Sequence, residues 1–217
     1  MNPAAALTTT LGFRPEAKRF ETLALGLPEI DTLIQGFPRG AISEIIGPES
    51  SGRTALAHSL LTAATARLEI CAYVDTHDSF DPASAAASGV TLDQLVWVRC
   101  GGNAEHAMKA ADNLMHAGGF GVVVLDLCQV PQKTCRRIPL SYWYRFRLAI
   151  ENTQTILVLL ERETLAKSCA ALMLELKRKR AVWSGPPGFQ LLRGMDLEAA
   201  SRKPVRPAPV VLNARVS

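Results

Sequence analysis

The chain of 217 residues lacks several features that mark special classes of protein. No apolar run approaches about 18 residues, so the sequence predicts no membrane-spanning helix. The N-terminus has no basic segment followed by an apolar core, so we expect no secretory signal and a cytoplasmic location. The sequence also contains no internal repeats.

Cysteine is present, but it lacks a metal-binding or disulfide pattern. No two of the five cysteines have C-x-x-C spacing, and none is spaced from histidine as in a zinc site. Cys71, Cys100 and Cys128 fall in or beside apolar runs, which is typical of buried thiols in a reducing compartment. We therefore expect neither a cysteine-based metal site nor a disulfide.

A large charge of one sign is absent as well. The chain has 24 Lys and Arg and 20 Asp and Glu, a net charge of +4. This permits an anionic partner but does not require one. A hydrophobic content of 48% with 20% charged residues is typical of a chain that buries a large core. The length indicates one sizeable domain with extensions.

The sequence does contain a nearly complete phosphate-binding loop. It fits the pattern G-x-x-x-x-G-K-[S/T] at every fixed position but one. The residues of the loop are Gly47, Pro48, Glu49, Ser50, Ser51, Gly52, Arg53 and Thr54. The two glycines allow a tight turn with inward N–H groups, and a helix opening at Thr54 would face the phosphates with its positive end. A plain Gly-Ser turn between a strand and a helix is the alternative interpretation.

Arg53 is the one departure from the pattern, which requires lysine. The lysine ammonium is a compact charge that reaches the terminal phosphates. The arginine guanidinium is a wide planar fork, so it does not substitute freely for lysine.

Hydrophobic patterning predicts strands and helices that alternate along the chain. Strands are expected at residues 41–46, 69–75, 95–98, 120–127, 155–160, 171–177 and 189–192. Helices are expected at residues 14–25, 55–68, 82–88, 103–117 and 139–150. This order predicts an α/β fold with a mostly parallel central sheet and helices on both faces. We expect an N-terminal arm or helix at 1–26, a core domain at 27–198, and a flexible basic tail rich in proline at 199–217.

Residues near the loop resemble the core of RecA-type recombinases. They are Phe37-Pro38-Arg39-Gly40, Glu44 to Gly52, Tyr73-Val74-Asp75, Asp81-Pro82, Gly89-Val90 and Leu92. The resemblance covers about residues 27–193 and implies a RecA-like P-loop domain, with a short helix at residues 27–34 before the first core strand. The chain is shorter than a full recombinase, which has an additional C-terminal domain. Its size, altered loop and basic tail are more similar to the ImuA family, RecA-like proteins of a bacterial translesion-synthesis cassette.

The resemblance also implies positions for ATP and Mg²⁺. Thr54 and Asp126, which ends the strand predicted at 120–127, would hold Mg²⁺. Asp126 is alternatively a cap for a following helix. The family places a water-activating glutamate at the position of His77, next to Asp78. Both are weak candidates for a general base, and we expect no confident catalytic residue.

Further positions depart from the family pattern. Ser84 stands where the family stacks a tyrosine on adenine, and Glu161-Arg162 stands where a glutamine senses the terminal phosphate. Together with Arg53 and His77, these departures predict a degenerate nucleotide site and argue against an efficient ATPase. No cofactor is firmly expected, and weak binding of ATP and Mg²⁺ stays open.

Two basic segments are candidates for contact with DNA or a partner. Their cations are Lys133, Arg136, Arg137, Arg145 and Arg147 in the first, and Lys177, Arg178, Lys179 and Arg180 in the second. The first segment also contains aromatic residues, a composition that single-strand binders use. In the alternative interpretation Trp143, Phe146 and Ile150 form the core face of a helix with a solvated basic rim. The second cluster is alternatively a solvated strand end or turn.

The function expected on this basis is an accessory role in DNA damage tolerance through protein partners. The resemblance implies the Y-family-like protein ImuB, an error-prone C-family polymerase and RecA itself as partners. Single-stranded DNA and a second copy of the chain stay open as further partners, and no membrane is expected. The alternatives are a DNA-stimulated ATPase of the RecA type and a cell-division inhibitor of the SulA type. The nearly complete loop argues against the second alternative.

Overall fold

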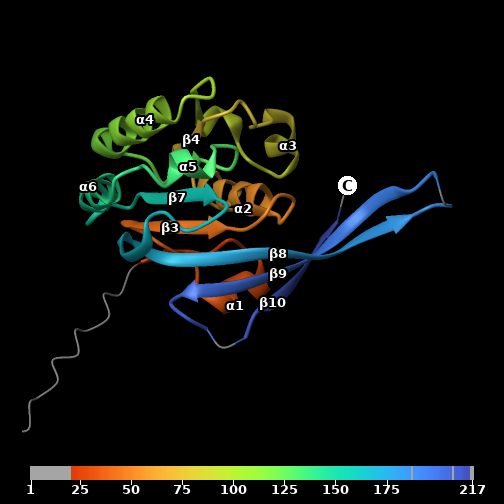
Figure 1. Cartoon of the computed structure of the whole chain (residues 1–217). Coiled ribbons are helices and arrows are strands. Elements are labelled where there is room, and N and C mark those ends of the chain that lie inside the picture. Colours follow the sequence, from red (N-terminus) through yellow and green to blue (C-terminus); the bar gives the residue numbers. More distant parts are fainter. Residues whose placement is uncertain (1–20, 187, 207, 216–217) are drawn as a thin grey trace, which may run out of the picture.

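A twisted sheet of eight strands runs through the middle of the domain (Figure 1). The computed structural model describes residues 21–186, 188–206 and 208–215. The strand order across the sheet is β10-β9-β8-β3-β7-β6-β4-β5. The strands from β8 to β5 are parallel, whereas β9 and β10 are added antiparallel at one edge. The predicted α/β fold with a mostly parallel sheet is confirmed.

The strands follow the apolar runs of the sequence closely. Those of the main sheet are β3 (Ala41–Ile46), β4 (Cys71–Asp75), β5 (Leu95–Arg99), β6 (Val122–Asp126), β7 (Ile156–Glu161), β8 (Ala170–Ser184), β9 (Leu191–Lys203) and β10 (Val210–Arg215). A separate pair consists of β1 (Thr22–Leu23) and β2 (Phe37–Pro38). The central parallel strands are nearly all apolar because helices cover both of their faces.

Helices lie in two layers, one on each face of the sheet (Figure 1). The α-helices are α1 (Pro28–Ile34), α2 (Arg53–Thr65), α3 (Pro82–Ala87), α4 (Ala104–Ala117), α5 (Gln132–Cys135) and α6 (Leu140–Ile150), with 3₁₀ turns at Leu92–Gln94 and Lys167–Cys169. The side chain of Asn103 caps α4 by accepting from the N–H groups of Glu105 and His106. Proline begins α1 and α3, where its missing N–H is not needed.

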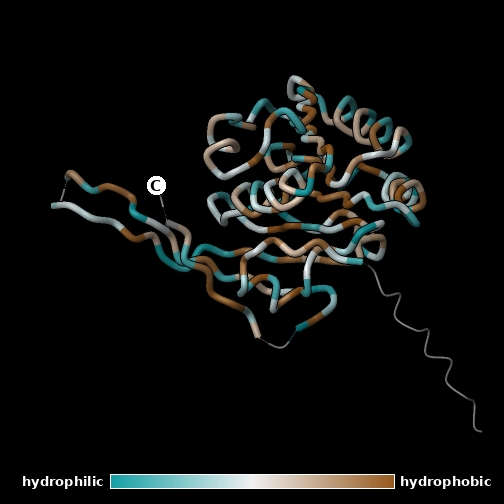
Figure 2. The backbone as a smooth tube through the Cα atoms, turned by 180° about the vertical axis from the view of Figure 1, so that it is seen from behind, coloured by the Kyte–Doolittle hydropathy of each residue, from teal (hydrophilic) through white to brown (hydrophobic). Residues whose placement is uncertain are grey.

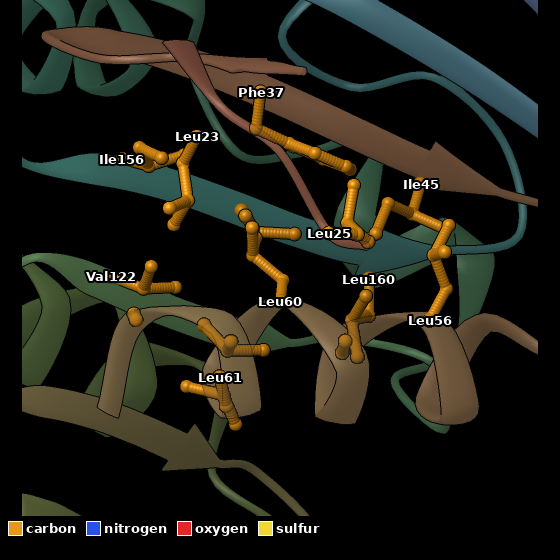
Figure 3. Close-up of a cluster of buried hydrophobic side chains, with 14 of the residues drawn as sticks. Leu23, Leu25, Phe37, Ile45, Leu56, Leu60, Leu61, Val122, Ile156 and Leu160 are labelled. Atoms are coloured by element: carbon orange, nitrogen blue, oxygen red, sulfur yellow. The ribbon is translucent and has the colours of Figure 1, made fainter. Parts of the chain in front are cut away.

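The core consists of two clusters, one under each helical layer. Because successive side chains of a strand point to opposite faces, Val122 and Val124 join one cluster while Val123 and Leu125 join the other. The first cluster lies between the sheet and α2 (Figure 3). The second packs α4 and α6 against the opposite face. The parallel strands β3, β4, β6 and β7 are therefore covered on both faces, which holds their ends in place.

The helix expected at residues 14–25 is wrong for its described part. Thr22 and Leu23 form β1, which pairs antiparallel with Phe37 and Pro38 of β2. Leu23 is 1% exposed and lies in the first core cluster. Burial of this leucine and of Phe37 outweighs the weak helical pattern of the segment. The rest of the predicted helix, and most of the predicted arm, lie outside the described residues.

The expected C-terminal strands and tail are also corrected. The turn between the two late strands lies where the sequence predicts it, but β8 and β9 are much longer than 171–177 and 189–192. The expected flexible tail is wrong for its described part, because β9 continues past residue 199 and β10 pairs with it. Cross-strand acids explain the length: Glu198 pairs with Lys179, and Asp196 with Arg180, so the strands continue through charged residues.

No helix among the residues that the structure describes is long and apolar enough to cross a membrane. All five cysteines are free, and four of them are buried. Burial raises the pKa of the Cys71 thiol to about 12. The predicted burial is therefore confirmed for Cys71 and Cys100, whereas Cys128 is only partly buried.

Candidate nucleotide-binding site

The candidate site lies where the parallel strands end. Registers place Ile46 of β3 beside Glu161 of β7, and Asp126 of β6 beside both Asp75 and Leu160. The loop that follows β3 is therefore next to the carboxyl ends of β7 and β6. In open α/β sheets this edge is where ligands bind.

Close packing explains both glycines of the loop. A Cβ atom on Gly47 would collide with the carbonyl oxygen of Leu176 in β8. At Gly52, which has a φ of +90°, a Cβ atom would lie 2.5 Å from Cδ1 of Leu197 in β9. The hairpin β8-β9 thus packs against the loop, and only glycine fits at these two positions. Helix α2 begins directly after Gly52, two residues before the predicted start.

The side chain of Arg53 is held by the protein itself. Its Nη1 donates to the carbonyl oxygen of Glu161 over 2.6 Å, and the residue is 7% exposed. The N–H of Gly47 donates to the same oxygen over 3.2 Å. The guanidinium is therefore tied to the end of β7. A lysine at this position in a working loop would instead direct its ammonium at phosphates.

A buried pair of glutamates lies behind the loop. Glu44 is fully buried in β3, and its carboxylate accepts from Thr164 Oγ1 at 2.7 Å and from the N–H groups of Leu165 and Ala166 at 2.8 and 2.5 Å. The carboxyl of Glu161 has no hydrogen-bond donor among the described residues. Burial and the neighbouring Glu44 raise the pKa of Glu161 well above its usual range. We infer that Glu161 is neutral in the folded protein.

A second arginine contacts the exposed side of the loop. Arg162 follows β7 and forms an ion pair with Glu49 of the loop. Its Nε also donates to the carbonyl oxygen of Cys128, 3.1 Å away. The phosphate loop is thus tied to the end of β7 by Arg53 and to the segment after β7 by Arg162.

The carboxylate of Asp126 is already engaged. It accepts from Tyr73 Oη at 2.8 Å, from the N–H of Cys128 at 2.9 Å and from Ser79 Oγ at 3.3 Å. Burial and the charge of Asp126 raise the pKa of Tyr73, so the phenol stays a donor. Thr54, the other predicted Mg²⁺ ligand, is exposed at the start of α2. Within the described ranges, no cluster of three or more His, Cys, Asp or Glu side chains is arranged to hold a metal ion.

The two weak candidates for a base lie on the turn after β4. His77 is half-buried, and its Nδ1 has no partner among the described residues. Asp78 is exposed and pairs with Arg99 of β5 over 2.9 Å, and the arginine lowers the pKa of Asp78. This carboxylate is a poorer base than an unpaired one. Neither residue supplies the positioned glutamate that the family uses.

The turn after β4 is fixed by Asp75. Its carboxylate accepts from the N–H groups of Ser79 and Phe80, each at 2.9 Å, and from Trp97 Nε1 at 3.1 Å. Ser84, at the position of the expected adenine platform, instead donates to Asp81 at the start of α3. A serine hydroxyl offers no aromatic face on which a base could stack.

The sequence of the loop thus keeps the phosphate-binding pattern, but the side chains around the loop do not fit hydrolysis of Mg²⁺–ATP. The cation at Arg53 is bound to a carbonyl oxygen, the acid Asp126 is bound to Tyr73, and the water-activating position is His77. We derive no catalytic step at this site.

The first basic segment is divided between core and surface. Trp143, Phe146 and Ile150 are 1%, 0% and 1% exposed, so they form the core face of α6. Arg136 pairs with Glu163, and Arg145 pairs with Asp112 and lies over Tyr142. Arg147 lies over the exposed Tyr144 at 4.9 Å. The core-face interpretation is confirmed for these three apolar residues, while Lys133 and Arg137 make no ion pair within the described residues.

The second basic segment lies inside β8, so the predicted strand end or turn is wrong. Lys177, Lys179 and Arg180 form ion pairs with Glu175, Glu198 and Asp196. Arg178 makes no ion pair among the described residues. Much of the predicted basic patch is thus neutralised by acids on its own hairpin.

Sequence reasoning missed two features of this region. The first is the set of hydrogen bonds from the segment after β7 to Glu44. The sequence did contain a sign of it, because Glu44 is the single acid in the apolar strand predicted at 41–46, and a buried acid needs hydrogen-bond partners. The second, the ion pair between Glu49 and Arg162, had no such sign, since the two residues are far apart in the chain.

Comparisons with known proteins agree with this geometry. The sequence model of the family described as "RecA N-terminal domain" matches residues 9–134, more than half of the chain. Protein RecA of Rickettsia massiliae is 38% identical over 118 residues, which are 54% of this chain and 34% of that protein. Protein RecA of Rhodospirillum rubrum is 40% identical over 118 residues, again 54% of this chain and 32% of that protein. The match thus spans about a third of the length of these relatives.

The fold has a solved counterpart. The crystal structure of the RadB recombinase superposes with a TM-score of 0.65 at 18% sequence identity, covering 90% of this chain and 96% of that one. At this identity the likeness concerns the fold alone. The sequence match, the strand order and the phosphate loop after β3 all lead to the same family. The chain therefore belongs to the RecA N-terminal domain family.

Proposed function

We propose that this chain is an accessory RecA-like protein of DNA damage tolerance, of the ImuA type, that works without turning over ATP. The observation that carries the proposal is the hydrogen bond from Arg53 to the carbonyl oxygen of Glu161. It places the only cation of the loop on the protein's own backbone. In this proposal the chain keeps the RecA-like fold but does not hydrolyse ATP.

The expected loss of nucleotide affinity is large. A missing charge-assisted contact with phosphate costs about 1.5–3 kcal/mol. The missing aromatic platform at Ser84 removes a further stacking contribution of about 0.5–1.5 kcal/mol. On these terms an affinity in the micromolar range becomes roughly millimolar. Any nucleotide would then be bound weakly, in keeping with a structural role.

The proposed partners are proteins of the translesion-synthesis machinery. They are the Y-family-like protein ImuB, an error-prone C-family polymerase and RecA. This part of the proposal rests on the resemblance of size, loop and basic C-terminal region to the ImuA family. Single-stranded DNA is a further proposed partner through the cations around α5 and α6.

The experiment is a complementation assay for damage-induced mutagenesis. Deletion of the gene should lower the frequency of mutations induced by ultraviolet light, and the wild-type chain should restore it. Thr54→Ala should restore it equally, because the hydroxyl of Thr54 has no chemical step to support. Failure of the deletion to affect mutagenesis would contradict the accessory role, and failure of Thr54→Ala to complement would contradict the non-catalytic site.

A DNA-stimulated ATPase is the second candidate. The observation that favours it is the intact backbone of the loop, with Gly47 and Gly52 in conformations that only glycine allows and Thr54 exposed at the start of α2. In that case Asp78 would need to leave Arg99 and reach the attacking water. Loss of complementation by Thr54→Ala would support this candidate.

A further inference from the structure

Helix α6 carries an apolar row of side chains on its exposed face. Leu140, Tyr144 and Leu148 are 52%, 51% and 50% exposed. Their spacing of four residues places them one above the other along the helix. We call these three residues the α6 ridge, which is about 12 Å long at 1.5 Å per residue. Single exposed leucines are common, but three half-exposed side chains in one row form a continuous surface that needs an explanation.

Packing of the helix in its own domain does not account for this ridge. The core contacts of α6 come from Trp143, Phe146 and Ile150, which lie on another face of the helix. Figure 1 shows α6 at the border of the domain, on the side opposite to the tip of the hairpin β8-β9. Figure 2, which views the domain from behind, shows hydrophobic residues among hydrophilic ones along this helix. The ridge is therefore accessible to another molecule.

The surroundings of the ridge are basic. Residues 127–150 contain five Lys or Arg and no Asp or Glu. Two of these cations pair with acids from other segments. Lys133, Arg137 and Arg147 form no ion pair within the part of the chain that the structure describes. Arg137 shortly precedes the helix, and Arg147 lies over the ring of Tyr144, 4.9 Å from its centre. The ridge is thus flanked by cations without acidic partners.

A cavity lies next to the C-terminal end of the ridge. It has a volume of about 550 Å³ and is formed by the end of α6 and the starts of β3 and β8. Its lining includes the small side chains of Ala41 and Ala170 and the cations Arg147 and Lys203. Arg147 is common to the cavity and the ridge, since it also lies over Tyr144. A large side chain of a docked molecule has room to anchor there.

These features select an acidic amphipathic helix as the partner. Side chains at i, i+4 and i+8 form the kind of ridge that packs into the groove of a second helix. The flanking cations then match Asp or Glu beside the apolar stripe of that helix. A second copy of the chain would instead bring its own cations against Arg137 and Arg147, and like charges oppose this. Nucleic acid would satisfy the cations, but it would leave the two leucines without apolar contacts.

We propose that the α6 ridge is a docking site for an acidic amphipathic helix of a partner protein. Leu140, Tyr144 and Leu148 pack into the groove of that helix, and Arg137 and Arg147 pair with its acids. The inference deepens the proposed function, and it rests on that function for the premise that the chain works through protein partners. The docking site itself uses neither the phosphate loop nor the hairpin β8-β9.

The test measures binding of the full chain to a fluorescein-labelled synthetic peptide of about 20 residues, long enough to form a helix. The peptide carries leucines in one stripe, glutamates beside the stripe and alanines elsewhere. One control peptide has the same composition with its leucines spread around the helix, and a second has lysines in place of the glutamates. Fluorescence anisotropy should show saturable binding of the acidic striped peptide and at least about tenfold weaker binding of both control peptides.

Two double variants separate the apolar from the ionic contribution. Leu140→Ser with Leu148→Ser should weaken binding of the acidic striped peptide about tenfold and leave its salt dependence unchanged, because the lost contacts are apolar. Arg137→Ala with Arg147→Ala should weaken binding about fivefold at low salt and less at high salt, because exposed ionic contacts are screened.

Matched variants elsewhere in the chain serve as controls. Leu68→Ser with Leu92→Ser changes leucines that are 80% and 38% exposed, values on either side of those of the ridge. Arg178→Ala with Arg193→Ala changes two exposed cations of the hairpin, so the net charge falls by the same amount. Both should bind the peptide within about twofold of the wild type, since surface changes away from a site have small effects. Unchanged thermal unfolding of all variants would show that the fold is intact.

The outcomes that overturn the proposal are distinct. Absence of binding by the acidic striped peptide would overturn it, as would equal binding of either control peptide or ridge variants that bind no worse than the controls. If the ridge variants instead lost binding to a single-stranded oligonucleotide, the ridge would belong to nucleic acid. If they changed the sedimentation of the protein alone, it would belong to a second copy. The complementation assay tests the proposed function separately, because its failure would leave binding of the peptide unaffected.

Discussion

At the scale of the residue, Arg53 decides what the phosphate loop can do. Its guanidinium is 7% exposed and bound to a carbonyl oxygen, so it is neither free nor shaped to follow a terminal phosphate. We predict that Arg53→Lys tightens binding of ATP about tenfold or more, as expected for one regained charge-assisted contact. Isothermal titration calorimetry of the purified variant with Mg²⁺ and ATP measures this.

Arg53→Ala is the control for that prediction. It also frees the carbonyl oxygen of Glu161, but it adds no cation, so its affinity should stay near that of the wild type. Equal gains in affinity for the lysine and alanine variants would show that Arg53 merely blocks the loop. A wild-type affinity already in the micromolar range would contradict the interpretation of Arg53 altogether.

The raised pKa of Glu161 gives a second prediction at this scale, because it makes the stability of the protein depend on pH. Its pKa in the folded protein lies well above the usual 4.5, because the carboxyl is buried beside Glu44. The folded state therefore holds a proton that the unfolded state has released once the pH exceeds about 4.5. The sign follows: the contribution of Glu161 to stability is fully present below that pH and is lost as the pH rises.

We predict that Glu161→Gln stabilises the protein, and that the gain in the free energy of unfolding grows as the pH rises above about 4.5. Glutamine is neutral at every pH and can donate to Glu44. Urea unfolding at several pH values measures the difference. Glu163→Gln, at an exposed carboxylate paired with Arg136, should show no such growth. A gain from Glu161→Gln that does not depend on pH would contradict a neutral Glu161.

At the scale of the element, α6 separates a core face from a surface face. Trp143 is 1% exposed and packs edge-to-face on Phe146 at 5.8 Å, whereas Tyr144 is 51% exposed. We predict that Trp143→Ala costs about 3–5 kcal/mol of stability. Tyr144→Ala should cost less than about 0.5 kcal/mol. Urea unfolding compares the two, and comparable losses would show that both aromatics are part of the core.

The strand β10 supports a second prediction about an element. Leu212 packs against the first core cluster, whereas Val211 is 53% exposed on the other face of the strand. Leu212→Ala should lower the free energy of unfolding by about 1–2 kcal/mol, because the site is only partly buried. Val211→Ala should change it little. If neither variant were destabilised, the C-terminal segment would be a loose tail rather than a strand of the sheet.

Local patterns could predict the elements of the parallel sheet but not its antiparallel edge. The apolar run 41–46 and the cap at Asn103 are signals within a few residues, and the structure has a strand and a helix start there. The length of β8 depends on Asp196 and Glu198, which face its cations from the other strand. The strand Thr22–Leu23 likewise depends on Phe37 of its partner. Pairings of this kind are not encoded in the segment itself.

At the scale of the whole molecule, the sequence indicated where the candidate site lies, but it did not indicate which contacts its side chains make. The pattern from Gly47 to Thr54 could be predicted in full, and the sheet brings it next to the ends of β7 and β6. The bond of Arg53 to Glu161 and the pair of Glu49 with Arg162 join residues more than 100 positions apart. Such contacts emerge only from the fold, and they are what ties the loop down.

The molecule as a whole is therefore a RecA-like domain with a basic extension. Its phosphate loop is locked to the end of β7 on one side, and its positive charge is gathered around the hairpin on the other. The two regions share a boundary, because Leu176 and Leu197 of the hairpin pack on the loop glycines. The rest of the hairpin extends away from this boundary (Figure 1).

The most direct test of this account is the rate of phosphate release from ATP by the pure protein, with and without DNA. We predict a rate in the presence of Mg²⁺ that is indistinguishable from that of Thr54→Ala. The reason is that His77 stands at the position where the family places its water-activating glutamate, and that Arg53 donates to the carbonyl oxygen of Glu161. Steady turnover of about 1 per second or faster, stimulated by DNA and abolished by Thr54→Ala, would contradict it.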